Sequence, residues 1–479
     1  MLPGTEDYYR LAPEILAAAF GVLILLAEPF LARERKGWLA RAGVFAAAVS
    51  LAAVAVPARY PGKAFSGLIV ADEFSVYVRL LVYAVALLVM LASYDYLQRD
   101  TLPIGEYYAL VLFATVGMGV MASANELITV FLGLEISSIS TYVLAGYRRD
   151  ALRSNESAMK YFLLGSFATA FFLYGVAMVY GAVGTTFLDM LRPKIAAPGG
   201  LLVTLGLGLM FVGLAFKIAA VPFQVWTPDV YEGAPTPVTA LLSTGPKAAA
   251  VAVTLRIFFT AFPDLGDAWF QLIYLSAILT MFVGNLAALV QSNVKRLLAY
   301  SSIAHVGYIL VAFAARSELG IAAILFYLFA YALMKLGAFT IVAHLGGAGE
   351  RRVAIADYAG LGWQQPAVAF CLSLYLLSLL GLPLTAGFVG KVYLLDAALR
   401  SDLVWLAVLA VINTFISAYY YLRVIRMMYF SEPLAEWPPV PVPITVGAVL
   451  LVTAAGILYL GIFPSHVMDW AAQAALSLR

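Results

Sequence analysis

The sequence predicts an all-α polytopic membrane protein with about 14 transmembrane helices, and three observations support this fold class. Of the 479 residues, 63% are hydrophobic and 12% are charged, whereas a soluble domain carries about 25% charged residues. The mean hydropathy is +0.93. Apolar runs of about 20 residues, the length that spans a bilayer, follow one another along the chain with only short loops between them.

These apolar runs define the expected helices in chain order. The first run is too long for a signal peptide, and Glu6 and Asp7 precede it where a signal peptide would carry basic residues, so we expect it to stay as a helix. No soluble domain fits between the runs. The predicted spans cover residues 11–31, 39–57, 73–95, 107–123, 126–146, 156–183, 200–222, 236–262, 268–291, 296–315, 318–345, 364–399, 402–429 and 442–463.

Two of the predicted spans are interrupted. In the stretch Gly213–Ala250, two lysines flank a segment rich in proline, and proline breaks a helix because it lacks a backbone donor. The span at 364–399 is interrupted by the residues GLPLTAG at 381–387. Irregular backbone at membrane depth is tolerated only where protein or water covers it, and buried lysine is costly there. Both features are typical of an ion pathway.

The two interrupted spans lie five helices apart, which indicates an internal repeat. When the segment Asn125–Tyr147 is aligned with Lys295–Ala314, Glu135 corresponds to His305. Repeat units with an odd number of helices are inverted in the membrane, as in many secondary transporters. We therefore expect an N-terminal three-helix segment (1–106), a first five-helix repeat (107–262), a second five-helix repeat (263–430), and a C-terminal helix and tail (431–479).

The distribution of basic residues predicts the orientation in the membrane. With the N-terminus outside, the inner loops hold about 14 lysines and arginines and the outer segments about 8, and the positive-inside rule favours that arrangement. Both termini are then expected on the outer face.

Composition excludes several function classes. The single cysteine, Cys371, cannot form a disulfide or hold an iron–sulfur cluster within this chain. The spacing of the three histidines does not indicate a haem site, and no nucleotide-binding motif is present. A net charge of +2 argues against a nucleic-acid partner.

Buried lysines are the candidates for chemistry. Of the nine lysines, four lie deep inside predicted spans: Lys217, Lys247, Lys335 and Lys391. Arginines, in contrast, fall mostly at span ends. Arginine stays protonated in proteins, but a desolvated lysine can release its proton, so a series of buried lysines can pass protons. Glu135 lies in the middle of its span, and we expect Lys217 to be its partner. His305 suits a relay because its ordinary pKa is near neutral.

Other charged and aromatic residues have a simpler interpretation. We expect Lys160 to pair with Glu156 at i, i+4 on the surface, and Lys295 and Arg296 to anchor a helix end at the interface. His344 is expected at a helix end, and the tyrosines at 419–421 are expected to pack in the core. For His305 and Lys335 a structural role competes with a relay role, so their place in the relay is provisional.

Four motifs resemble the antiporter-like subunits of respiratory complex I, which are related to subunits of multi-subunit cation/proton antiporters. The motifs are AFKIAAVPFQVWTPDVYEGAPTPVTALLSTGPKAA, ESAMKYFLLGSFA, VKRLLAYSSIAHVGY and GLPLTAGFVGKVYL, and the resemblance covers almost the whole chain. Within the family, TPDVYEGAPTPVTA followed by a PKAA lysine is similar to subunit N, the relative of mitochondrial subunit 2.

The resemblance implies a fold and a set of functional residues. It implies 14 membrane helices with two inverted five-helix repeats, and a polar axis that includes Glu135, Lys217, Lys247 and Lys391, with His305 and Lys335 less firmly supported. It also implies a bacterial inner-membrane protein without a redox centre of its own. FMN, the iron–sulfur clusters and the quinone would belong to partner subunits of the respiratory complex.

Four functions remain open at this point. The first is a proton-translocating subunit of an NADH:quinone oxidoreductase, and the second is a subunit of a cation/proton antiporter without a redox partner. The third is a structural spacer in which the lysines are inherited packing. The fourth is the membrane arm of a hydrogenase or of a dehydrogenase fed by ferredoxin or F420, because the peripheral arm chooses the electron donor.

Overall fold

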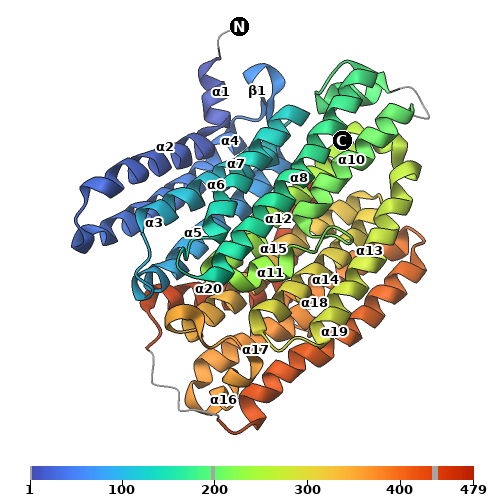
Figure 1. Cartoon of the computed structure of the whole chain (residues 1–479). Helices are drawn as coiled ribbons and strands as arrows, with labels where there is room; N and C mark the ends of the chain where they lie inside the picture. Colours follow the sequence, from blue (N-terminus) through green and yellow to red (C-terminus); the bar gives the residue numbers. More distant parts are fainter. Residues whose placement is uncertain (1–2, 196–199, 434–440, 479) are drawn as a thin grey trace.

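The computed structural model describes residues 3–195, 200–433 and 441–478, in which helices run side by side through most of the molecule (Figure 1). Thirteen helices in these residues are long and apolar enough, by length and composition, to cross a membrane. The predicted span at 364–399 is formed by two further helices separated by a break, so the fold class and the number of spans are confirmed. The long helices are α2 (Ala12–Ala27), α3 (Gly37–Ala53), α5 (Glu73–Arg99), α6 (Gly105–Ser123), α7 (Leu127–Ala145), α8 (Leu152–Val183), α10 (Leu201–Ile218), α12 (Thr236–Arg256), α13 (Gly266–Leu289), α14 (Val294–Ala314), α15 (Glu318–Leu345), α17 (Pro366–Leu380), α18 (Ala386–Arg400), α19 (Val404–Phe430) and α20 (Ile444–Ile462).

Short elements lie between the long helices. A two-stranded antiparallel hairpin pairs Gly62 with Ala71 and adds a small sheet to the expected helical fold. The C-terminal helix α21 lies against α5 and α15. The short elements are α1 (Thr5–Arg10), α4 (Ala55–Arg59), β1 (Gly62–Ala64), β2 (Ile69–Ala71), α9 (Leu188–Leu191), α11 (Thr227–Gly233), α16 (Leu361–Gln364) and α21 (Ser465–Leu476).

The two ends of the bundle differ in charge. One end, called the hairpin end below, carries β1 and β2 and also both terminal segments. There, Asp7 accepts a hydrogen bond from the backbone N–H of Phe65 at 3.3 Å. Ser477 accepts one from the backbone N–H of Phe74, at the start of α5, at 3.1 Å. The opposite end, called the basic end, carries the loops and helix ends that hold Lys36, Arg99, Arg148, Arg149, Arg153, Lys295, Arg296, Arg351 and Arg352.

The first predicted break separates α10 from α11. The helix ends where Ala219 adopts a left-handed backbone with φ of 66°, and the Val221–Pro222 peptide bond is cis. The backbone N–H of Val221 donates to Thr280 at 2.9 Å, and its carbonyl accepts from Ser276 at 3.1 Å. Both hydroxyls belong to α13. They replace the hydrogen bonds that a continuous helix would have made, which is the condition for irregular backbone at membrane depth.

The second predicted break separates α17 from α18. Gly381 ends α17 with φ of 95°, a conformation that favours glycine. The hydroxyl of Ser378, in the last turn of α17, accepts a hydrogen bond from the backbone N–H of Gly387 at the start of α18, at 3.2 Å. Both interrupted spans are therefore confirmed. The inverted relation of the two halves and the four-part division of the chain remain predictions.

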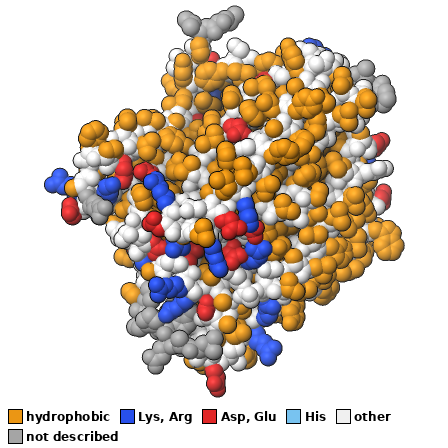
Figure 2. All heavy atoms as spheres, in the orientation of Figure 1, with side chains coloured by type: hydrophobic (Ala, Val, Ile, Leu, Met, Phe, Trp, Pro, Cys, Tyr) orange, Lys and Arg blue, Asp and Glu red, His pale blue; other side chains and the backbone are white. Residues whose placement is uncertain are grey.

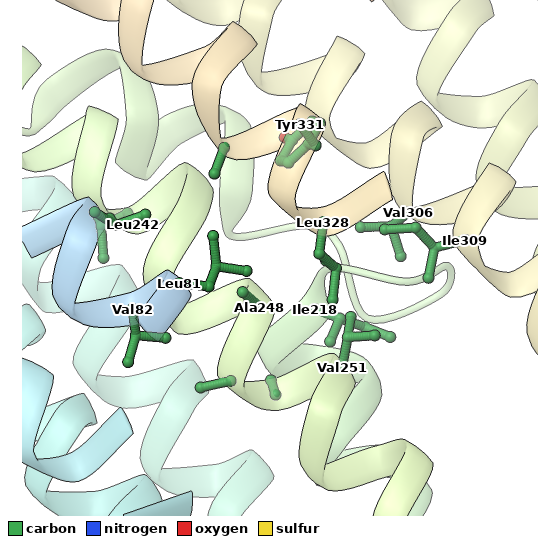
Figure 3. Packing of buried hydrophobic residues seen from close by; sticks show 14 of the residues in the cluster. Leu81, Val82, Ile218, Leu242, Ala248, Val251, Val306, Ile309, Leu328 and Tyr331 are labelled. Atoms are coloured by element: carbon green, nitrogen blue, oxygen red, sulfur yellow. The ribbon is translucent and has the colours of Figure 1, made fainter. Parts of the chain in front are cut away.

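The middle of the bundle is an apolar core built by helices from all parts of the sequence. Figure 3 shows buried side chains of α5, α10, α12, α14 and α15 that meet there, including Leu81, Ile218, Ala248, Val306 and Leu328. Three of these residues directly follow a candidate relay residue in the sequence, at 217, 247 and 305. The candidate residues are therefore held inside packed hydrocarbon, where an unpaired polar group is costly.

Two buried arginines form ion pairs near the hairpin end that the sequence analysis did not predict. Arg79 of α5 is fully buried, donates to both carboxylate oxygens of Glu14 on α2 at 2.8 and 3.2 Å, and also bonds Ser123 of α6. Arg256, at the end of α12, makes a two-bond pair with Asp72 at 2.8 and 2.9 Å. These pairs tie the N-terminal helices to α6 and α12.

Replacing Arg79 with methionine alone should destabilise the protein strongly, because Glu14 would remain buried without a partner. The expected loss is about 3–5 kcal/mol, whereas the double change Arg79→Met with Glu14→Leu should recover most of it. Thermal unfolding of the purified protein in detergent measures both variants. Equal midpoints for the single and double variants would contradict the assignment of this pair as a buried ion pair.

Candidate functional site

Lys217 lies at the carbonyl end of α10, directly before the first break. Its side chain is buried, and its Nζ donates to the hydroxyl of Ser138 on α7 at 2.8 Å and to that of Tyr161 on α8 at 3.3 Å. The ring centroids of Tyr142 and Tyr161 lie 5.8 and 5.5 Å from Nζ, in reach of a cation–π interaction. The free carbonyls at a helix C-terminus also favour a cation. Neutral groups thus hold this lysine.

Glu135 does not pair with Lys217, contrary to the expectation from the sequence. Within the described residues its Oε1 is buried and has no hydrogen-bond partner. Lys217 Nζ is instead bonded by the hydroxyls of Ser138 and Tyr161, which are neutral partners. Glu135 is half-buried and lies one turn before Ser138 on α7, at the border between the buried side of this helix and the exposed side that carries Leu132 and Ile139. Its role in a relay stays a prediction.

Lys247 lies in the fully buried part of α12. Its Nζ donates to the hydroxyl of Ser302 on α14 at 2.5 Å, and Ser302 in turn bonds the hydroxyl of Tyr331 on α15 at 2.6 Å. The ring of Tyr231 on α11 lies 5.5 Å from Nζ. Again the partners of the lysine are neutral.

An aromatic group connects the surroundings of Lys217 and Lys247. Tyr161, which bonds Lys217, stacks on Trp226 with ring centroids 4.5 Å apart. Trp226 packs edge-on against Tyr231, the ring next to Lys247, at 6.0 Å. The irregular segment between α10 and α11 supplies Trp226, so the break in the helix places the aromatic bridge between the two lysines.

His305 and Lys335 belong to one continuous chain of hydrogen bonds. Lys335 Nζ donates to Ser301 at 2.9 Å and to the carbonyl of Leu298 at 2.8 Å. Ser301 bonds the hydroxyl of Tyr421 at 2.5 Å, and Tyr421 bonds His305 Nε2 at 3.1 Å. His305 Nδ1 bonds Tyr327 at 2.5 Å. Helices α14, α15 and α19 build this chain, and Ser301 is the sequence neighbour of Ser302, which bonds Lys247.

Lys391 lies beside the second break. Its Nζ donates to the carbonyl of Leu380, the last residue of α17, at 2.9 Å, and the ring of Tyr308 lies 4.6 Å away. Tyr308 packs edge-on against His305 at 5.8 Å. A small cavity, lined in part by Tyr308, Lys391 and Thr414, adjoins this group. Lys391 is thus held at the carbonyl end of a half-helix, as Lys217 is.

The structure therefore brings five of the six candidate residues into one buried region, and Glu135 lies at its border, one turn from Ser138 on α7. Sequence reasoning missed the hydroxyl groups that bond them, namely Ser138, Tyr161, Ser301, Ser302 and Tyr327, and also Tyr331, which bonds Ser302. The description of the tyrosines at 419–421 as packing residues is incomplete, because Tyr421 also bonds Ser301 and His305. For Ser301, Ser302 and Tyr331 the sequence held one signal, a position within about one helical turn of His305 or Lys335.

Charged groups at the basic end form a separate cluster around α11, visible in Figure 2 as a mixed acidic and basic patch. Lys160 pairs with Glu156 at 2.7 Å, as expected, and also with Asp229 of α11 at 2.6 Å. Arg296 of α14 pairs with Asp229 at 2.7 Å and with Glu232 at 3.0 Å. These pairs hold the short helix α11 between α8 and α14.

Lys295 is not an exposed anchor but a buried residue in an ion pair. It donates to Glu350 at 2.7 Å and to the carbonyl of Ala234 at 2.6 Å. Burial acts to raise the pKa of Glu350, but the charge of Lys295 and hydrogen bonds from Lys295, Thr236 and Tyr96 outweigh it and hold this pKa below its ordinary value. His344 lies in the last turn of α15, as expected, and is buried.

Comparison with known proteins identifies relatives over the full chain. A family model described as NADH:quinone oxidoreductase/Mrp antiporter, TM, matches residues 124–417. A protein of Solibacter usitatus named NADH-quinone oxidoreductase subunit N 1 is 47% identical over 477 residues, which cover 99% of this chain and 98% of the relative.

Solved structures agree with this similarity. A chain of respiratory complex I from Thermus thermophilus with bound aureothin superposes with a TM-score of 0.82 at 36% identity, over 96% of this chain and 99% of that chain. A chain of the Mrp complex from Dietzia sp. DQ12-45-1b superposes with a TM-score of 0.87 over 99% of this chain and 97% of that chain. Its identity is 21%, so this second likeness concerns the fold alone.

The lowered pKa of Glu350 predicts a pH dependence of stability. A carboxyl whose pKa is lower in the folded state stabilises the protein above its unfolded pKa of about 4.3, and this contribution is lost as the pH falls through the folded pKa. The variant Glu350→Gln should therefore be less stable than the wild type at pH 7, by about 3 kcal/mol, and the difference should narrow below about pH 4. Thermal unfolding in detergent between pH 7 and pH 3.5 tests this, and a constant difference would contradict it.

Proposed function

Because the chain belongs to the NADH:quinone oxidoreductase/Mrp antiporter transmembrane family, we propose that it is subunit N of a proton-translocating NADH:quinone oxidoreductase, set in the membrane arm of that complex. The observation that carries this proposal is similarity along the whole chain to a relative named subunit N and to a chain of respiratory complex I. The likeness to the Mrp complex supports only a shared fold, so the antiporter function is less well supported.

The proton path that we propose runs through the buried lysines in the order Lys217, Lys247 and Lys391, with His305 and Lys335 between the last two. Lys217 and Lys247 are separated by Tyr161, Trp226 and Tyr231. Lys247 reaches the chain of Lys335 and His305 through the adjacent hydroxyls of Ser302 and Ser301. Tyr308 lies between His305 and Lys391. Glu135, one turn before Ser138 on α7, is proposed as the member of the relay that precedes Lys217.

Neutral partners suit a proton carrier for a physical reason. An ammonium bonded to a carboxylate in a low-dielectric interior would have to break a strong ion pair before it released its proton. Hydroxyls and carbonyls stabilise the ammonium less, and a hydroxyl can also donate a hydrogen bond to the neutral amine. Each lysine here can therefore exist with or without its proton while keeping the same neighbours.

Partners and location follow from the same proposal. FMN, the iron–sulfur clusters and the quinone are expected in other subunits, and this chain would contact the other antiporter-like and small subunits of the membrane arm. We propose a bacterial inner membrane with both termini on the outer face, since the excess of basic residues lies at the basic end. This chain would move protons while partner subunits reduce the quinone in the respiratory chain.

Purification tests the assignment to a complex. A tagged chain isolated gently from its native membrane should bring flavin, iron–sulfur subunits and inhibitor-sensitive NADH:quinone reductase activity with it. An isolate that contains only small membrane subunits and exchanges cations for protons in vesicles would favour the antiporter function. Redox subunits that accept electrons from ferredoxin or F420 but not from NADH would identify a related complex.

The variant Lys217→Ala tests the relay. It should lower quinone reduction and proton translocation together, by roughly tenfold or more, because a blocked proton path stalls a tightly coupled electron transfer. The same change at Lys194, an exposed lysine in a loop at the hairpin end, is the matched control and should leave both rates unchanged. Wild-type turnover with an unchanged proton-to-electron ratio in Lys217→Ala would mean that this lysine is structural.

A further inference from the structure

A buried carboxylate at the basic end, Glu350, takes no part in the relay described above. Its Oε1 accepts three hydrogen bonds, from the hydroxyl of Tyr96 at 2.8 Å and from the backbone N–H and hydroxyl of Thr236, each at 2.6 Å. Its Oε2 accepts from Lys295 at 2.7 Å. The side chain is 7% exposed. Glu350 thereby meets the first residue of α12, the helix that carries Lys247.

The backbone around Glu350 is unusual. Glu350 has φ of 55°, in the left-handed region that non-glycine residues seldom adopt, and Gly347 and Gly349 beside it have φ of 69° and 73°. Such a conformation persists only where the surroundings over-determine it, and it is frequent at functional sites. Here the four hydrogen bonds of the side chain hold the residue in place.

Glu350 lies next to a hollow that opens at the basic end. The wall of the hollow includes Ala348 and Gly349, the two residues before Glu350, and also Arg99, Asp100 and Arg148. The backbone N–H of Gly349 faces the carboxylate of Asp100 at 3.4 Å. A group at position 350 is therefore one residue away from the aqueous side of the chain, although it is itself buried.

A row of hydroxyls leads from Glu350 toward Lys247. Thr236, Thr239, Ser243 and Lys247 are spaced at i, i+3, i+7 and i+11, so they lie on one face of α12. The three hydroxyl residues are fully buried. Thr239 donates to the backbone carbonyl of Tyr231, whose ring lies beside Lys247. At a rise of 1.5 Å per residue, this row is about 16 Å long.

We propose that Glu350 is the residue through which protons enter this chain from the basic end, and that the hydroxyl face of α12 carries them to Lys247. This inference rests on the proposed function, because it supplies the entrance to that relay. The Glu350 carboxylate accepts a proton from the hollow, which cancels its attraction for Lys295. The proton then passes along the hydroxyls of α12, with water between them, to the neutral amine of Lys247. Glu350 returns to the carboxylate and pairs again with Lys295.

The charged groups that face Glu350 fit this role. Lys295 of α14 is its direct partner, Tyr96 of α5 bonds it, and Arg148 and Asp100 lie in the adjoining wall. The only acidic side chain at the start of the hydroxyl face, among the described residues, is Glu350 itself; the carboxylates of α11 are bonded to Lys160 and Arg296 instead. The wall of the hollow also carries the carboxylates of Asp100 and Asp150, and Glu350 is the buried carboxylate between this wall and the hydroxyl face of α12.

The test compares variants of the intact complex reconstituted in vesicles, with quinone reduction and proton translocation measured together. Glu350→Gln keeps the shape but cannot carry a proton, and Glu350→Asp keeps the carboxylate. The double variant Glu350→Gln with Lys295→Gln removes both charges, so no unpaired charge remains buried. Asp72→Asn is the matched control, since Asp72 supports the other end of α12 through an ion pair with Arg256.

If Glu350 carries protons, Glu350→Gln and the double variant should both lose proton translocation by roughly tenfold, and Glu350→Asp should keep most of it. Recovery in the double variant would overturn the proposal, because it would mean that the carboxylate only balances Lys295. Equal losses in Asp72→Asn and in Glu350→Gln would also overturn it, as both would then act by supporting α12.

Two further variants keep the result unambiguous. If changes at 350 prevent assembly of the complex, Thr239→Val combined with Ser243→Ala tests the hydroxyl face alone, and wild-type translocation in that variant would overturn the proposal. Lys247→Ala is measured in the same series. Normal proton translocation in Lys247→Ala would contradict the proposed proton path as a whole. If Lys247→Ala loses translocation while Glu350→Gln keeps it, only the entrance at Glu350 is contradicted.

Discussion

The interaction on which the structure depends is the hydrogen bond between a buried lysine and a neutral acceptor. A desolvated ammonium is costly unless its N–H groups are satisfied. Lys217, Lys247, Lys335 and Lys391 are each bonded to hydroxyls or backbone carbonyls, and none of the four forms an ion pair among the described residues. The break after α17 supplies one such acceptor, the carbonyl of Leu380 that bonds Lys391, because a half-helix ends in free carbonyls.

Ion pairs occupy different positions in the same bundle. Arg79 with Glu14 and Arg256 with Asp72 lie near the hairpin end, and Lys295 with Glu350 lies at the basic end. A bidentate arginine pair holds its charge and its geometry, which suits a tie between helices. The molecule therefore separates two uses of charge: paired charges join helices near the two ends, and lysines with neutral partners lie in the middle.

Tyrosine and tryptophan side chains connect the surroundings of the buried lysines and His305. Trp226 comes from the irregular segment after α10 and separates the surroundings of Lys217 and Lys247, while its indole N–H donates to the carbonyl of Phe216 at 2.9 Å. Tyr421 and Tyr327 extend the reach of His305 to Ser301 and to α15. Large aromatic rings with one polar atom fill an apolar core and still leave a donor or acceptor where a proton path needs it.

The sequence by itself determined the helices, the two breaks and the lysines within them, because each of these depends on local composition: apolar length, proline and glycine, and charge in an apolar run. It did not determine which face of each helix points inward. In a membrane helix nearly all faces are apolar, so the periodicity that orients a helix in a soluble protein is weak. Only the tertiary structure could therefore show that hydroxyls and not Glu135 bond Lys217, that Ser302 faces Lys247, and that Glu14 lies against Arg79. The contacts of Lys217 and Lys247 join residues 55 to 79 positions apart, and packing between whole helices decides such contacts.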